Sequence, residues 1–150
     1  LGQMMGSGKS EQEIRDTNRK LVTLSVSMGV VFGALLALIA EPFPKFYNAE
    51  PEVRALATKL ILIVAIMKPS DTYMYAGYYT LRSGGKTFIT ILFDSCYVWV
   101  IVVPVAFCLS RFTSMPIVPL FFCCQFIEIG KCIIGAIMIK SGIWIQKIVT

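Results

Sequence analysis

Five charged residues lie within long apolar stretches of this sequence, and they are its strongest functional signal: Lys68, Asp71, Asp94, Glu128 and Lys131. An ionised side chain at the depth of a lipid bilayer is costly, and it persists where it faces a bundle interior or a water-filled cavity. The sequence therefore predicts a polytopic membrane protein that moves something polar or charged, rather than a passive anchor.

The composition indicates that lipid is the solvent for most of the chain. Of the 150 residues, 56% are hydrophobic and 15% are charged, and a water-soluble domain of this size would retain much exposed surface. The net charge of +5 is explained by Lys and Arg beside the apolar runs. We therefore expect the lipid bilayer as a partner and no nucleic acid.

The fold class predicted is an all-α membrane protein with four transmembrane helices. Proline and glycine clusters separate the apolar runs, which are each near bilayer-spanning length. The predicted spans are residues 21–40, 51–81, 88–109 and 117–139.

This pattern divides the chain into three parts. Residues 1–20 form a cytoplasmic amphipathic segment, residues 21–139 form the transmembrane bundle, and residues 140–150 form a cytoplasmic tail. Ser10 followed three residues later by Glu13 is a capping box, which begins a helix that we expect to run straight into the first span. Trp144 in the tail is expected to anchor the chain at the membrane interface.

Small residues recur every four positions along the first span. They share one face of a helix, where they allow another backbone to approach closely; packing within one chain is favoured here over homodimerisation. They are Ser25, Gly29, Gly33 and Ala37.

The distribution of basic residues between the spans predicts the orientation, because Lys and Arg gather on the cytoplasmic side. The richer side holds Lys9, Arg15, Arg19, Lys20, Arg82, Lys86, Lys140 and Lys147, and the other side holds Lys45, Arg54 and Arg111. Both termini are therefore expected to be cytoplasmic, with the protein in the inner membrane.

Asp71 follows Pro69 and Ser70 inside the second predicted span. Proline removes a backbone hydrogen bond and kinks a helix, which leaves carbonyl oxygens free at membrane depth. Carbonyl, hydroxyl and carboxylate oxygens suit a sodium ion, and a buried carboxyl group suits a proton. We therefore predict an ion-coupling site of Asp71, Ser70 and Asp94, where loading with Na⁺ or H⁺ biases one helix conformation against another.

The remaining buried charges are expected to form a network of Lys68, Glu128 and Lys131. Glu128 and Lys131 are three residues apart, so they share a helix face and can pair; Lys68 and Asp71 have the same spacing across Pro69. The alternative is that all of these residues are mutually neutralising pairs that hold the bundle together.

Enzymatic chemistry is not indicated. The sequence has no His, and its five cysteines lack metal-ligand spacing, so we expect no metal site, no cofactor and no catalytic residues. Residues 6–10, Gly-Ser-Gly-Lys-Ser, end like a phosphate-binding loop, but Gln3 stands where that motif requires Gly.

Several local sequences resemble the C-terminal third of the multidrug and toxic compound extrusion (MATE) family. The most specific is Leu-Arg-Ser-Gly-Gly at residues 81–85; residues 46–53, the Pro-Ser-Asp sequence at 69–71 and Gly142-Ile143-Trp144 add to it. The resemblance covers nearly the full chain. It departs from many members at Lys86, where they have Asp.

This resemblance implies a fold of twelve helices in two six-helix lobes, of which the four spans here would be the last four. It implies antiport, in which drug-like organic cations leave the cytoplasm in exchange for sodium ions or protons. Asp71 would occupy the place of an acidic residue that helps to form a cation site in part of the family. The partners implied are the eight preceding helices of the same transporter and small organic cations.

An adaptable cavity for flat cations is expected from the aromatic and methionine side chains after the kink, Tyr73, Met74 and Tyr78. Two other functions remain open: a lipid-linked saccharide flippase of the same superfamily, and a non-transporting membrane scaffold subunit.

Overall fold

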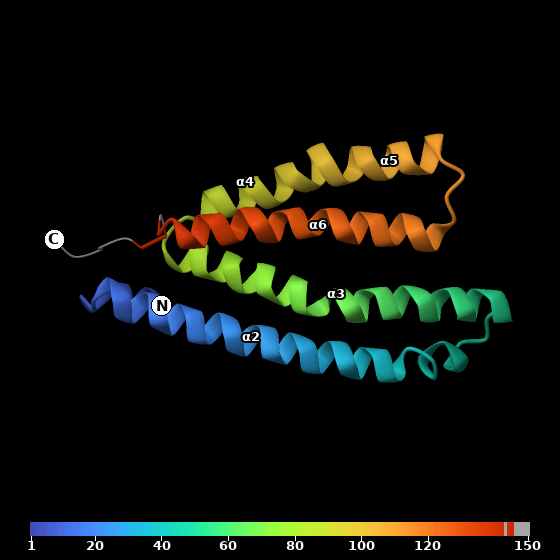
Figure 1. Cartoon of the computed structure of the whole chain (residues 1–150), viewed down its shortest axis with the longest axis horizontal. Coiled ribbons are helices and arrows are strands. Elements are labelled where there is room, and N and C mark those ends of the chain that lie inside the picture. The colour runs from blue at the N-terminus through green and yellow to red at the C-terminus, as the bar shows by residue number, and fades with distance from the viewer. Residues whose placement is uncertain (143, 146–150) are drawn as a thin grey trace.

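The computed structural model describes residues 1–142, 144 and 145, and most of these residues are helical. The α-helices are α1 (Gly2–Gly6), α2 (Glu11–Ile39), α3 (Pro51–Ser83), α4 (Thr87–Tyr97), α5 (Val103–Phe112) and α6 (Ile117–Lys140). The long helices lie side by side, and α2 begins at the same end of the bundle where α6 ends (Figure 1). The predicted tail falls partly outside the described residues, because Ile143 and residues 146–150, including Lys147, are among those not described.

The α2 helix begins at the predicted capping box. The Ser10 backbone N–H donates to Glu13 Oε2 at 3.2 Å, and the Glu13 backbone N–H donates to Ser10 Oγ at 3.3 Å. Two of the unpaired amides at the helix start are thereby satisfied. The helix then continues without a break from the polar segment to Ile39, as expected.

The α2 and α3 helices pack together through glycines of the predicted small-residue face. A Cβ atom at Gly33 would overlap the Ala65 carbonyl oxygen, and one at Gly29 would overlap the Thr72 side chain. Both glycines are buried. The expectation of packing within one chain is therefore confirmed for these two positions.

The α3 helix has 33 residues and contains Pro69 in its interior. Because Pro69 has no N–H, the Ala65 carbonyl receives no i→i−4 hydrogen bond from it. The helix changes direction along its length in Figure 1. A short 3₁₀ helix, Phe43–Phe46, lies between α2 and α3, where the sequence predicts a loop.

A π-helical segment, Val98–Val102, connects α4 to α5 without a break in helical structure. Pro104 follows it and cannot donate a backbone hydrogen bond to Val100, so the ladder of α-helical bonds must be interrupted here. The third predicted span is therefore one continuous helical rod with a wider turn near its middle.

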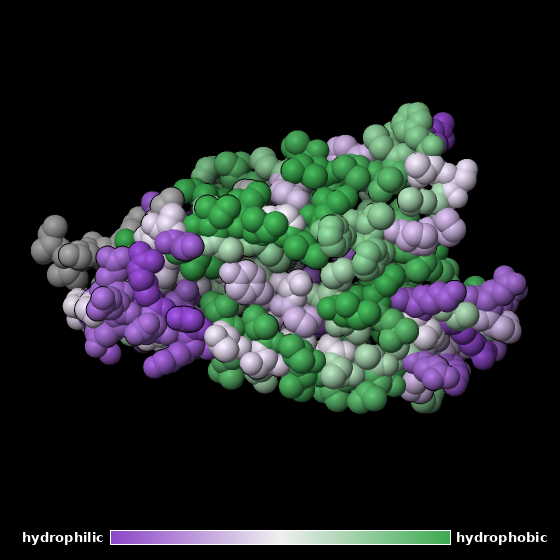
Figure 2. All heavy atoms as spheres, viewed as in Figure 1, coloured by the Kyte–Doolittle hydropathy of each residue, from purple (hydrophilic) through white to green (hydrophobic). Residues whose placement is uncertain are grey.

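An apolar band covers the middle of the molecule, and hydrophilic residues gather at both ends of the face shown in Figure 2. Within the described residues, three helices are long and apolar enough to cross a membrane: α2, the continuous helix Thr87–Phe112, and α6. The α3 helix has sufficient length, but its sequence also contains Arg54, Lys59, Lys68 and Asp71.

A compact hydrophobic cluster lies where α2 begins and α6 ends. It consists of Met5, Ile14, Leu81 and Trp144. Trp144 is only 1% exposed, and its indole N–H donates to the Ile139 carbonyl at 3.0 Å. The prediction that Trp144 anchors the tail at the membrane interface is therefore wrong: its ring is buried against other parts of the chain.

Candidate functional site

Lys131 of α6 is the centre of a group of polar side chains inside the apolar part of the bundle. Its Nζ atom lies 3.2 Å from Asp94 Oδ1 of α4 and 3.8 Å from Glu128 Oε1. Only 4% of the Lys131 side chain is exposed. The predicted pairing with Glu128 is present, but the shorter contact is with Asp94.

A tyrosine of α3 joins the same group. The Tyr78 hydroxyl donates to Asp94 Oδ1 at 3.3 Å, so one carboxylate oxygen accepts hydrogen bonds from both α3 and α6. We name Tyr78, Asp94, Glu128 and Lys131 the polar network. It connects α3, α4 and α6. Most of its residues are too far apart in sequence for a local spacing pattern to predict their contacts.

Tyr97 supports this network from α4. Its hydroxyl donates to the Ile127 carbonyl at 2.7 Å, and Lys131 Nζ lies 5.7 Å from the centre of its ring, within the range of a cation–π interaction. The close approach depends on Gly130, because a Cβ atom there would overlap the Tyr97 hydroxyl. Tyr97 follows Asp94 by three residues, so the shared helix face was a signal available in the sequence.

Asp71 lies just after the Pro69 kink and is half-buried. Lys68 and Lys131 are close enough for their charges to act on its carboxylate. Among the residues that the structure describes, however, Asp71 forms neither an ion pair nor a hydrogen bond. Lys68 and Asp71 thus lie near each other without forming an ion pair or a hydrogen bond.

The kink is also tied to α6. The Cys132 thiol lies 3.4 Å from the Ser70 carbonyl oxygen, to which it donates, and Cys132 directly follows Lys131 in sequence. Ser70 therefore sits close to the chain segment that carries the polar network. The role of Cys132 as this link was not anticipated from the sequence.

A cavity of about 270 Å³ opens beside the kink. It is lined by Val26, Pro69, Ser70, Tyr73 and Cys132. Of the three side chains expected to surround a substrate cavity, Tyr73 lines this space, whereas Met74 and Tyr78 are buried at 7% and 6% exposure. Tyr78 instead contacts Asp94, as described above.

Chemically, this arrangement can hold or release one positive charge. The polar network and the kink together contain three carboxylates, Asp71, Asp94 and Glu128, and two ammonium groups, Lys68 and Lys131. The group therefore has one carboxylate more than it has amines. A single cation or proton would balance its charge.

The chain has a match among known protein families. A family model described as MatE matches residues 1–108. The matched region includes Asp71 and Asp94, whereas Glu128 and Lys131 follow it. No solved structure matches the chain.

Proposed function

The chain belongs to the MatE family of membrane transporters, and from this premise we propose that it forms the last four membrane-spanning helices of a cation-coupled antiporter. The transporter would export drug-like organic cations by alternating access, in exchange for Na⁺ or H⁺. The MATE resemblance of its local sequences agrees with the family match. The eight preceding helices of the same transporter would be its partners.

In this proposal α3 also crosses the membrane, in addition to the three helices whose length and apolar composition are sufficient for crossing by themselves. Its 33 residues correspond to roughly 50 Å at 1.5 Å per residue, which exceeds a hydrocarbon core of about 30 Å. Its charged residues are acceptable at that depth because Lys68 and Asp71 are partly covered by the chain itself.

The observation that carries the proposal is the unpaired state of Asp71 within the described residues, beside a proline kink. Asp94 and Glu128 share Lys131 as a counter-charge, whereas Asp71 forms no ion pair within the described residues, so we assign the ion site to Asp71. Binding of a sodium ion or a proton there would lower the cost of burying it. Release would raise that cost, so the occupancy of Asp71 would bias the conformation of α3.

The Pro69 kink is a place where the conformation of α3 can change. The Ala65 carbonyl lacks its α-helical donor, and Gly33 of α2 lies against that carbonyl without a side chain. The two halves of α3 are therefore connected by fewer hydrogen bonds than an uninterrupted helix would have. We propose that Ser70 and Asp94 complete the ion site when the helix moves.

The test is transport by the intact gene product in membrane vesicles. An imposed sodium or proton gradient should drive efflux of a fluorescent organic cation, and Asp71→Asn should abolish this coupled efflux. Asp16→Asn is a matched control, because Asp16 is exposed on the polar part of α2. Unchanged coupling in Asp71→Asn would refute the assignment.

The alternatives are outcomes of the same experiment. Translocation of a lipid-linked saccharide without dye efflux would indicate a flippase. A stable homo-oligomer of the 150-residue chain that transports neither would indicate a scaffold subunit.

The proposed orientation places both termini in the cytoplasm and the protein in the inner membrane. In a chain whose five native cysteines are replaced by serine, cysteines introduced by Ser7→Cys and Asn48→Cys report on opposite ends of the bundle. A membrane-impermeant maleimide added to intact cells should label Asn48→Cys and leave Ser7→Cys unlabelled. The reverse pattern would overturn the orientation.

A further inference from the structure

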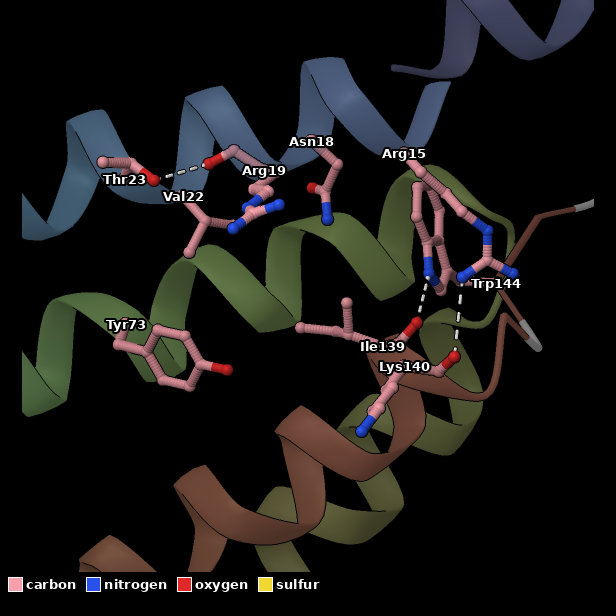
Figure 3. A pocket seen from close by; sticks show the side chains of 9 residues that line it. All are labelled: Arg15, Asn18, Arg19, Val22, Thr23, Tyr73, Ile139, Lys140 and Trp144. Atoms are coloured by element: carbon pink, nitrogen blue, oxygen red, sulfur yellow. Dashed lines mark hydrogen bonds between the residues drawn. The ribbon is translucent and has the colours of Figure 1, made fainter. Parts of the chain in front are cut away.

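A second cavity, of about 260 Å³, lies at the end of the bundle where α2 begins and α6 ends. Figure 3 shows that its lining comes from α2, α3, the end of α6 and the segment that follows α6. The lining residues are Arg15, Asn18, Arg19, Val22, Thr23, Tyr73, Ile139, Lys140 and Trp144. Since a water molecule takes about 30 Å³, the space is large enough for a headgroup of several heavy atoms.

Three of the lining side chains are cationic and none is acidic. Arg15 is held in place by Glu11, whose Oε1 lies 2.7 Å from Arg15 Nη2, and Arg15 Nη1 reaches the Lys140 carbonyl at 3.5 Å. Among the described residues, the Arg19 and Lys140 side chains form no ion pair or hydrogen bond. In the part of the chain that the structure describes, two positive charges at this cavity therefore lack a counter-charge.

The shape of the chain near Arg15 fits this arrangement. Gly142 has φ of +74°, a conformation that glycine adopts readily, and a Cβ atom there would overlap Arg15 Nη2. The glycine thus lets the segment after α6 turn closely around the guanidinium. The cationic wall of the cavity is built by chain segments far apart in sequence.

The cavity lies at the polar boundary of two candidate membrane spans. The charge-free part of α2 begins at Leu21, directly after Arg19 and Lys20, and α6 ends at Lys140. On the side of the cavity nearer the middle of the bundle, Val22 and Ile139 form apolar walls. A ligand here would meet cations at its polar end and hydrocarbon along its length.

We propose that this cavity binds the phosphate group of an acidic phospholipid, whose acyl chains then lie along α2 and α6. Basic pockets between membrane helices favour anionic headgroups, and guanidinium groups donate paired hydrogen bonds to phosphate oxygens. The Tyr73 hydroxyl adds a neutral donor from α3. This inference requires only that the chain resides in a membrane, so it is independent of the proposed transport activity.

Tryptophan fluorescence provides a direct readout. The chain has two Trp residues, so Trp99→Phe leaves Trp144, which lines the cavity, as the sole reporter. The 150-residue chain is reconstituted in phosphatidylcholine vesicles that contain a minor fraction of either brominated phosphatidylglycerol or brominated phosphatidylcholine. We expect the anionic lipid to quench Trp144 with an apparent affinity about fivefold higher, the factor that one basic residue near an anionic surface supplies.

Two double variants separate this cavity from general charge attraction. Arg19→Gln with Lys140→Gln should reduce the preference for the anionic lipid to nearly onefold. Lys9→Gln with Lys20→Gln removes the same charge from the same end of the bundle, at residues that do not line the cavity, and should leave most of the preference intact.

Three outcomes would overturn the proposal. They are equal quenching by both brominated lipids in the Trp99→Phe chain, an equal loss of preference in both double variants, and saturable binding of inorganic phosphate. The last is measured as a shift of Trp144 emission in pure phosphatidylcholine vesicles, and it would identify a free phosphate as the ligand.

Discussion

Lys131 Nζ lies 3.2 Å from Asp94 Oδ1, and this ion pair joins α6 to α4. The two partners differ in environment, because 4% of the lysine side chain is exposed and 47% of the aspartate side chain is. The amine is enclosed while its carboxylate lies at an open edge of the bundle. Replacing Lys131 is therefore expected to change the stability of the chain by a different amount than replacing Asp94.

Lys131→Met should lower the free energy of unfolding by about 1–3 kcal/mol, because Asp94 and Glu128 both lose their counter-charge. The measurement is thermal unfolding in detergent micelles, followed by circular dichroism. Lys59→Met is the control, since Lys59 is exposed on α3, and its effect should stay within about 0.5 kcal/mol. Equal unfolding midpoints for the two variants would contradict the role given to Lys131.

Gly33→Ala should destabilise the chain by about 1–3 kcal/mol, because its new methyl group would overlap the Ala65 carbonyl of α3. Gly135→Ala is a matched substitution in α6, where a Cβ atom meets no heavy atom within 4 Å. That change should stabilise the helix by about 0.5–1 kcal/mol through lower backbone entropy in the unfolded chain. Opposite signs in the same unfolding assay are expected, and the same sign for both would contradict the packing described.

Thr80→Val should cost about 1–3 kcal/mol because it leaves buried Asn18 without its partner. Thr80 Oγ1 lies 2.6 Å from Asn18 Oδ1, and the two residues are 2% and 5% exposed. Thr23→Val serves as the comparison: Thr23 is exposed, and its hydroxyl donates only to the Arg19 carbonyl. Faster amide hydrogen exchange where α2 meets α3 should accompany the loss in Thr80→Val alone.

Pro69→Ala should reduce gradient-driven dye efflux by the intact protein without loss of stability, because alanine restores the missing hydrogen bond and favours a straight helix. Pro119→Ala is the control: Pro119 lies in the first turn of α6, where an amide has no helical acceptor. Wild-type coupled efflux in Pro69→Ala would show that the kink is dispensable.

The ends of the helices are predictable from the sequence because particular residue types mark them. Prolines, glycines and charges interrupt the apolar runs, so the predicted span at 117–139 differs by one residue from Ile117–Lys140. The capping box at Ser10 is local and was equally readable. The MatE match agrees with the resemblance drawn from residues 69–71 and 81–85.

The contacts between helices were less predictable. Spacing identifies Glu128 as a partner of Lys131, but it cannot indicate Asp94, which is 37 residues away. Trp144 was misplaced for a related reason. Its amphipathic ring suits a membrane interface, yet the fold brings Met5 and Leu81 to the same position and buries it.

The π-helical segment Val98–Val102 affects how the protein tolerates a change in the length of the continuous helical rod Thr87–Phe112. A π turn accommodates one residue more than an α turn, and one residue corresponds to a rotation of about 100° around the axis. Loss of a single residue from this segment would therefore convert the wide turn into an ordinary one. The two halves of the rod would keep the directions in which Asp94 and Arg111 project, so a one-residue deletion is expected to preserve the Asp94–Lys131 ion pair, although Pro104 would still kink the rod.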